Sequence, residues 1–111
     1  MDISVETTMN YLKAGEIIFV FVSVTNRSGR SVHAMAIVAL FDRDNKMMGL
    51  AYMSKTIDVG VTEQLNAGLR LPEDVTDHVL RVFVWEGKSL ENTTMYPLSD
   101  VFELSPEPKR E

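Results

Sequence analysis

The sequence of 111 residues predicts an all-β domain, built as an antiparallel β-sandwich. Residues 16–26 and 78–86 are dense in β-branched and aromatic residues, which strands favour. Polar turns containing Gly, Asn and Asp separate such segments at short and regular spacing. No segment is convincingly periodic at 3.6 residues, as an amphipathic helix would be. This combination is typical of two packed antiparallel sheets.

The first part of the chain predicts two strands. Residues 2–7 alternate, with Ile3 and Val5 on one side and polar residues on the other, which indicates a short half-buried strand. Residues 10–15 form a connection between strands, in which Gly15 is the residue that breaks the strand pattern. Residues 16–26 give the strongest strand signal and are apolar on both faces. Residues 26–31 form a polar turn.

The middle of the chain predicts three more strands. Residues 33–42 are again apolar on both faces; Ala and Met also allow a helix over residues 32–40, but the neighbouring strands and the following turn favour a strand. Residues 42–46 form a hairpin turn, and residues 47–57 continue as a less regular strand. After a break at Gly60, residues 61–71 alternate well.

The last part of the chain predicts two strands and a tail. Residues 72–77 form a connection, residues 78–86 form the strand with the single tryptophan, and residues 96–104 form a strand interrupted at Pro97. We therefore expect a seven-stranded, immunoglobulin-like sandwich over residues 1–104. Residues 105–111 read as a polar, proline-punctuated tail or linker.

Composition narrows the classes of function. Hydrophobic residues make up 45% and charged residues 24%, as in ordinary globular domains. Cysteine is absent, which excludes a disulfide scaffold, a thiolate metal site and a cysteine nucleophile. The net charge of −5 provides no basic surface for nucleic acid. No apolar run reaches the roughly 20 residues of a membrane-spanning helix, and the N-terminus does not resemble a signal peptide.

Two sequence blocks resemble a known family. ALFD at residues 39–42, followed by KMMG at residues 46–49, resembles the conserved hairpin of a module in secreted proteins of clostridia and related Gram-positive bacteria. VFVWE at residues 82–86, followed by Leu90 and YPLS at residues 96–99, resembles the end of that module. The resemblance implies an immunoglobulin- or fibronectin type III-like sandwich at the cell surface, with an accessory role and no catalysis. The loop after Trp85 is longer here than in the family pattern.

The strand with the tryptophan supplies the candidate binding residues. If alternate residues of this strand face the core, then Arg81, Phe83 and Trp85 share the opposite face. Together with Tyr96, this aromatic group could stack on a polysaccharide or anchor a neighbouring domain. The alternative is that Trp85 covers the sheet edge and packs under the loop that follows it.

The two strands that are apolar on both faces raise a second possibility. An isolated sandwich needs one apolar face on each sheet, so a loop, a second copy or an adjacent module could cover the other. The alternative is that the side chains on the outer face are small enough for their exposure to water to be tolerated. Accordingly, we expect the chain to be a non-catalytic accessory module that serves as a spacer, packing or adhesion element. Carbohydrate binding and self-association are the alternative functions.

Other polar groups give weaker signals. The turn from Asp42 to Asn45 could ligate calcium, although Asp and Asn are also the usual residues of a hairpin turn. His33 and His78 lie at strand starts without neighbouring ligands, so we expect neither a metal site nor a cofactor. Residues 26–28 and 92–94 match the acceptor pattern for N-glycosylation, which would mean nothing in a bacterial protein.

Overall fold

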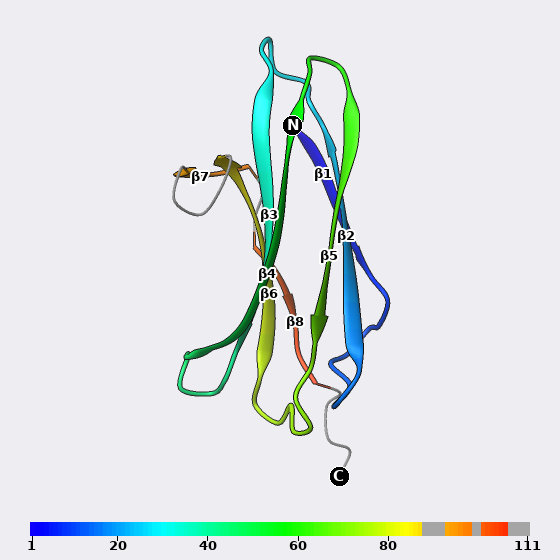
Figure 1. Ribbon diagram of the computed structural model, residues 1–111, viewed down its shortest axis with the longest axis vertical. Coiled ribbons are helices and arrows are strands. Elements are labelled where there is room, and N and C mark those ends of the chain that lie inside the picture. The colour runs from blue at the N-terminus through cyan, green and yellow to red at the C-terminus, as the bar shows by residue number, and fades with distance from the viewer. Residues whose placement is uncertain (88–92, 99–100, 107–111) are drawn as a thin grey trace.

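The computed structural model describes residues 1–87, 93–98 and 101–106, with residues 93–97 described by their backbone alone. The strands of the described residues are β1 (Asp2–Thr7), β2 (Ile17–Thr25), β3 (Val32–Phe41), β4 (Met47–Ile57), β5 (Thr62–Arg70), β6 (Val79–Gly87), β7 (Thr93–Pro97) and β8 (Phe102–Leu104). They form two sheets, in the orders β1-β2-β5 and β4-β3-β6-β7, and every pair is antiparallel. Figure 1 shows these sheets as two facing layers. The predicted immunoglobulin-like β-sandwich is therefore confirmed.

The predicted last strand is split into β7 and β8, and both pair with β6. Pro97 lies opposite Trp85, and Phe102 lies opposite Val82, so the two pieces follow one another along the same edge of β6. Between them, the amide of Leu98 donates a hydrogen bond to the Val84 carbonyl at 2.7 Å. The predicted interruption at Pro97 thus marks the end of β7. The segment for which a helix was possible is the strand β3.

The core lies between the sheets and is built from alternate residues of the central strands. Ile18, Val20, Val22 and Val24 of β2 face the buried residues of β3 and β6. This alternation is the expected result when one face of each strand packs on the opposite sheet. The remaining buried members are Met9, Leu12, Ala34, Ala36, Val38, Leu40, Ile57, Leu65, Leu71, Val75, Leu80, Val82 and Val84.

Contacts between the sheets close both sides of the sandwich. On one side, Lys55 of β4 and Glu63 of β5 form an ion pair at 3.4 Å. On the other, the amide of Leu12 donates to the Ser105 carbonyl at 3.0 Å, and Leu12 forms an isolated bridge with Pro106. The first two residues of the predicted tail therefore contact the domain. The molecule is elongated, with extents of 51 × 25 × 20 Å.

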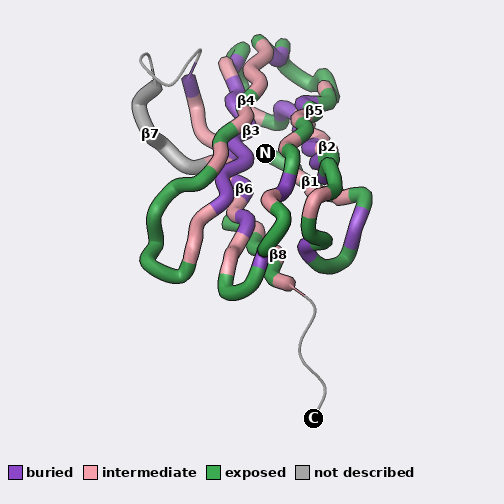
Figure 2. Tube along the Cα trace, turned by 60° about the horizontal axis from the view of Figure 1, so that its bottom comes forward, coloured by how far each residue is buried: buried purple, intermediate pink, exposed green. Residues whose placement is uncertain are grey.

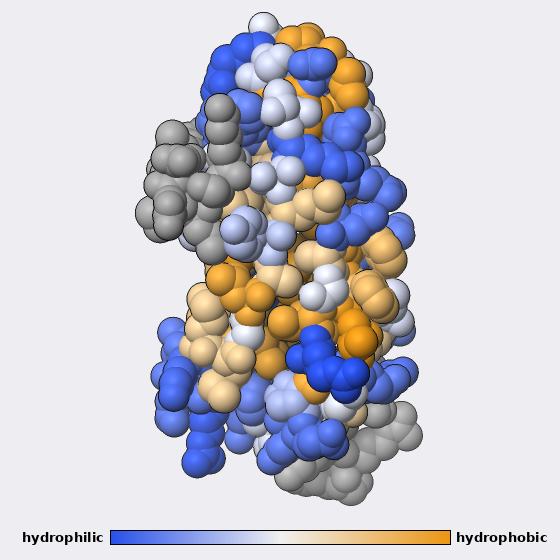
Figure 3. All heavy atoms as spheres, viewed as in Figure 1, coloured by the Kyte–Doolittle hydropathy of each residue, from blue (hydrophilic) through white to orange (hydrophobic). Residues whose placement is uncertain are grey.

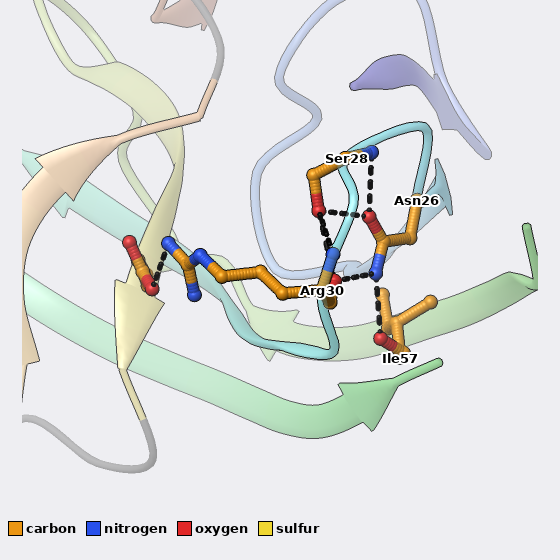
Figure 4. Close-up of polar contacts among 5 residues, drawn as sticks. Asn26, Ser28, Arg30 and Ile57 are labelled. Carbon is orange, nitrogen blue, oxygen red and sulfur yellow. Dashed lines mark hydrogen bonds and ion pairs between the residues drawn. The ribbon is translucent and has the colours of Figure 1, made fainter. Parts of the chain in front are cut away.

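A buried asparagine holds the connection from one sheet to the other (Figure 4). Asn26 follows β2 and is 0% exposed. Its side-chain amide donates to the carbonyls of Arg30 and Ile57, both at 2.8 Å, and its Oδ1 accepts the Ser28 amide at 2.9 Å. This network satisfies a polar group that would be costly to bury alone. Since both amide hydrogens are engaged inside the fold, the folded chain does not present the acceptor pattern at residues 26–28.

The described residues contain no helix long and apolar enough to cross a membrane.

Candidate interaction surface

The outer face of the β4-β3-β6 sheet carries a second apolar layer, outside the sandwich core. Met35, Ile37 and Ala39 of β3 alternate with the core residues of that strand and therefore point away from the core. They are nevertheless 0%, 4% and 0% exposed, respectively. Figure 2 shows burial along most of the β3 trace. In β3, both faces of the strand are thus removed from water.

The residues that flank this layer follow from the strand register. Met35 lies between Ser54 and Trp85, on β4 and β6 respectively. In the next row, Ile37 lies between Tyr52 and Phe83. Because side chains of directly paired residues lie about 5 Å apart, these large flanking side chains cover the smaller central ones. The following row places Ala39 between Leu50 and Arg81.

The predicted aromatic pair is present on this face. The rings of Phe83 and Trp85 have centroids 5.5 Å apart, and both residues are partly buried. Their planes are inclined by 46°, a tilted packing that aromatic pairs commonly adopt. Since the rings do not share a plane, a flat sugar ring could stack on one of them but not on both.

Arg81 shares the face with the aromatic pair, as predicted, but its guanidinium is engaged within the chain. It donates a hydrogen bond to Oδ1 of Asn45 at 3.0 Å and forms an ion pair with Glu103 at 3.4 Å. Its guanidinium carbon also lies 5.0 Å from the centroid of the Phe41 ring. Arg81 therefore links β6 to β8 and to the hairpin between β3 and β4.

Tyr96 was the fourth predicted binding residue. It belongs to β7, whose pairing with β6 brings residue 97 opposite Trp85. The side chain of Tyr96 lies outside the described part of the structure, as does the loop of residues 88–92. Membership of Tyr96 in the aromatic group, and packing of Trp85 under that loop, therefore stay predictions.

The exposed apolar residues of β4 were not among the predicted binding residues. Leu50 is 40% exposed and Tyr52 is 49% exposed, and both lie on the same face as Phe83 and Trp85. The available signal was their alternation with Gly49 and Ala51, whose small side chains made the strand look irregular. Met47 and Met48 precede them and are 49% and 52% exposed. Figure 3 looks onto the side of the molecule where β4 and β5 run, and shows hydrophobic residues gathered in its middle and lower parts.

The turn considered for calcium is organised by its own backbone. Oδ1 of Asp42 accepts hydrogen bonds from the amides of Asp44 and Lys46, both at 2.9 Å. Asn45 has a φ of 62°, a left-handed conformation that asparagine tolerates well in turns. Among the described residues, no group of three or more acidic, His or Cys side chains is arranged to hold a metal ion. Asp42 is thus the capping residue of a hairpin.

The end of the sandwich near this turn has an open hollow of about 840 Å3, lined by residues that include Arg43, His78 and Glu103. Nδ1 of His78 lies 2.8 Å from the Thr76 carbonyl, so this nitrogen carries the hydrogen. Hydrogen bonds from Thr76 lower the pKa of the nearby Asp74 carboxyl. At the opposite end of β3, Nδ1 of His33 lies 2.7 Å from Oγ1 of Thr56. His78 thus bonds within its own turn, and His33 bonds across to the neighbouring strand β4.

Comparisons with known proteins found no matching family model, curated protein or solved structure.

Proposed function

We propose that this chain is a non-catalytic accessory module that packs against a neighbouring module, of the same polypeptide or of another protein, through the outer face of its β4-β3-β6 sheet. The observation that carries this proposal is the apolar layer of Met35, Ile37 and Ala39, which lies outside a core that is already complete. An isolated sandwich gains its stability from the layer between its sheets and needs no second one.

The residues around this layer have the character of an interface. Aromatic residues, Met and Arg are enriched at protein interfaces, and this face supplies Phe83, Trp85, Tyr52 and Arg81. Tyr52 is 49% exposed. Covering its exposed half would remove roughly 100 Å2 from water, which is worth about 2.5 kcal/mol. A partner on this face would therefore gain affinity from side chains that solvent now reaches.

The size of the face suits a linked neighbour. Six residue steps of about 3.3 Å and three strands about 4.8 Å apart give a face of roughly 20 × 15 Å, or about 300 Å2. Two such surfaces bury about 600 Å2, which lies at the lower end for domains within one chain. Free partners generally need about 1,200 Å2 or more in total. Packing on this face is thus best supported when a linker raises the effective concentration of the neighbour.

The resemblance of the hairpin and tryptophan blocks to modules of secreted bacterial proteins supports an extracellular or cell-surface location. The strand orders β1-β2-β5 and β4-β3-β6-β7 are compatible with the fibronectin type III-like arrangement that this resemblance implies, because β4 lies beside β3 and not beside β5. In such a location, the module would serve as a spacer, a packing partner or an adhesion element.

Two phenylalanines provide the test. Phe83 of β6 and Phe21 of β2 are both partly buried, and both lie on outer faces, but of different sheets. Phe83→Ala should lower the melting temperature of the module more in the polypeptide that carries it than in isolation, because the contact with the neighbour is lost as well. Phe21→Ala should have the same effect in both settings. Equal behaviour of the two variants in a calorimetric comparison would contradict packing on this face.

Carbohydrate binding is the second candidate, and the contact between Phe83 and Trp85 supports it. Stacking of a sugar on Trp85 would make binding depend on that ring. A pull-down with plant, host and cell-wall polysaccharides, repeated with Trp85→Ala, separates the two candidates. Retention that disappears in the variant would favour the sugar ligand. Absence of retention, or retention that survives the substitution, would remove it.

A further inference from the structure

Strand β4 lies at an edge of its sheet and is the longest strand among the described residues, with 11 residues. It pairs with β3 on one side, and no described strand forms a ladder with its other side. Such an edge presents backbone amides and carbonyls that can pair with another strand. Proteins normally protect edges by keeping them short or by placing charged residues or proline there.

The edges of the other sheet carry charges along their length, whereas the protections of β4 lie near its ends, in a register irregularity at residues 47–49 and in Lys55. Strand β1 has six residues and includes Asp2 and Glu6, and β5 carries Glu63 and Arg70. In β4, the one charged residue is Lys55, which is paired with Glu63. Residues 47–54 are uncharged and contain no proline. Four large apolar side chains of this stretch are 40–52% exposed: Met47, Met48, Leu50 and Tyr52.

We propose that β4 pairs antiparallel with β4 of a second copy of this chain, so that the two sheets become one continuous sheet across a two-fold axis. An antiparallel contact between identical strands is self-complementary, which is what a closed dimer requires. A register with Ala51 opposite its own copy would place Leu50 opposite Tyr52 of the second copy, twice. These are apolar cross-strand pairs of the kind that stabilises antiparallel sheets.

Charge and size favour this occupant and this geometry. The chain has a net charge of −5, but the pairing stretch is neutral, so no like charges meet at its centre. Stacking two copies face to face through the outer face would bury only about 600 Å2, well below the roughly 1,200 Å2 of a stable dimer. Edge pairing adds backbone hydrogen bonds and leaves the outer faces side by side. It does not depend on the packing function proposed above.

The test is sedimentation velocity of the full chain over a wide range of concentrations. The double variant Leu50→Lys/Tyr52→Lys places like charges opposite each other across the proposed pairing and should weaken dimerisation by about tenfold or more. The matched control is Ile17→Lys/Phe19→Lys on β2, where the residues are 44% and 48% exposed. This control should dimerise like the unsubstituted chain. Circular dichroism confirms that both variants remain folded.

Hydrogen exchange distinguishes edge pairing from stacking of faces. Pairing at the edge should slow exchange of amides within residues 48–53 as concentration rises, while stacking would leave those amides unchanged. A monomer at every concentration overturns the proposal. So does a dimer without this protection, or one that the two double variants weaken equally. Failure of dimerisation would leave the comparison of Phe83→Ala with Phe21→Ala unaffected.

Discussion

The outer faces of the two sheets differ although the central strands β2 and β3 look alike in sequence. Both strands are apolar on both faces. In β3, the outward residue Ile37 is 4% exposed, whereas Ile17 and Phe19 of β2 are 44% and 48% exposed. Both strands lie between two neighbours in their sheets, but the ladder of β1 with β2 begins at Val20, so Ile17 and Phe19 have ladder partners on β5 only. Position within the sheet therefore explains part of the difference, because Ile37 is flanked by ladder partners on both sides.

The size of the cross-strand neighbours adds to this difference. Ile37 lies between two aromatic residues, Tyr52 and Phe83, which shield it from both sides. Phe19 has Gly68 as its partner on β5, so its ring stands above a position without a side chain. Burial on an outer face thus depends on both the presence and the size of side chains on the two flanking strands, and apolarity of the central strand is not sufficient.

Replacing the same residue type on each face should show the largest difference. Ile37→Ala should destabilise the fold by about 2–4 kcal/mol, because it removes buried methylene groups and leaves a cavity. Ile17→Ala should cost less than about 1 kcal/mol, because that side chain is half exposed. Urea unfolding of the two variants measures both values. Similar costs would show that the outer layer of β3 contributes no more than the exposed surface of β2.

Substitution of Gly68, the partner of Phe19 on β5, should test why the outer face of β2 is exposed. A Cβ at Gly68 would lie 3.0 Å from Cδ1 and Cε1 of Phe19, so the ring would have to move. Moving the ring should cost about 1 kcal/mol, the scale of an off-rotamer side chain, and this offsets the roughly 0.5–1 kcal/mol gained by replacing a strand glycine, so Gly68→Ala alone should leave stability nearly unchanged. In the Phe19→Ala background, the same change should stabilise the chain by roughly 0.5–1 kcal/mol, because glycine weakens a strand. A double-mutant cycle by chemical denaturation measures this coupling, and Gly68→Ala effects that are equal in the two backgrounds would contradict the contact.

The sequence was sufficient for the fold class and for the predicted face of β6, because both depend on alternation within a strand. Leu80, Val82 and Val84 are buried in the core, and Arg81, Phe83 and Trp85 share the other face, as expected. The exposed residues Leu50 and Tyr52 escaped because Gly49 and Ala51 obscured the alternation of β4.

The other differences between the sequence-based expectations and the structure result from contacts between residues far apart in the sequence. Asn26 read as part of a polar turn, yet it is buried, because its side chain reaches the carbonyl of Ile57 on a distant strand. Arg81 was predicted to share the face of the aromatic pair, and the structure adds that Asn45 and Glu103 are brought to it by the hairpin and by β8. Local pattern contains no information on such partners, since the register between strands determines them.

The last contrast concerns two arginines, Arg81 of β6 and Arg27 in the connection between β2 and β3. Arg81 combines a hydrogen bond to Asn45, an ion pair with Glu103 and a contact over Phe41, so Arg81→Ala should cost about 1–2 kcal/mol. Arg27 is ion-paired with Asp2 at the exposed edge of the other sheet, with side chains 66% and 61% exposed. Arg27→Ala should therefore cost less than about 0.5 kcal/mol. Thermal unfolding at low and high salt separates the contributions: salt should abolish the small effect at Arg27 and leave most of the effect at Arg81, where stem packing over Phe41 persists. An Arg81 effect that salt removes completely would mean that only charge acts at Arg81, as at Arg27, and would contradict the contribution of packing over Phe41.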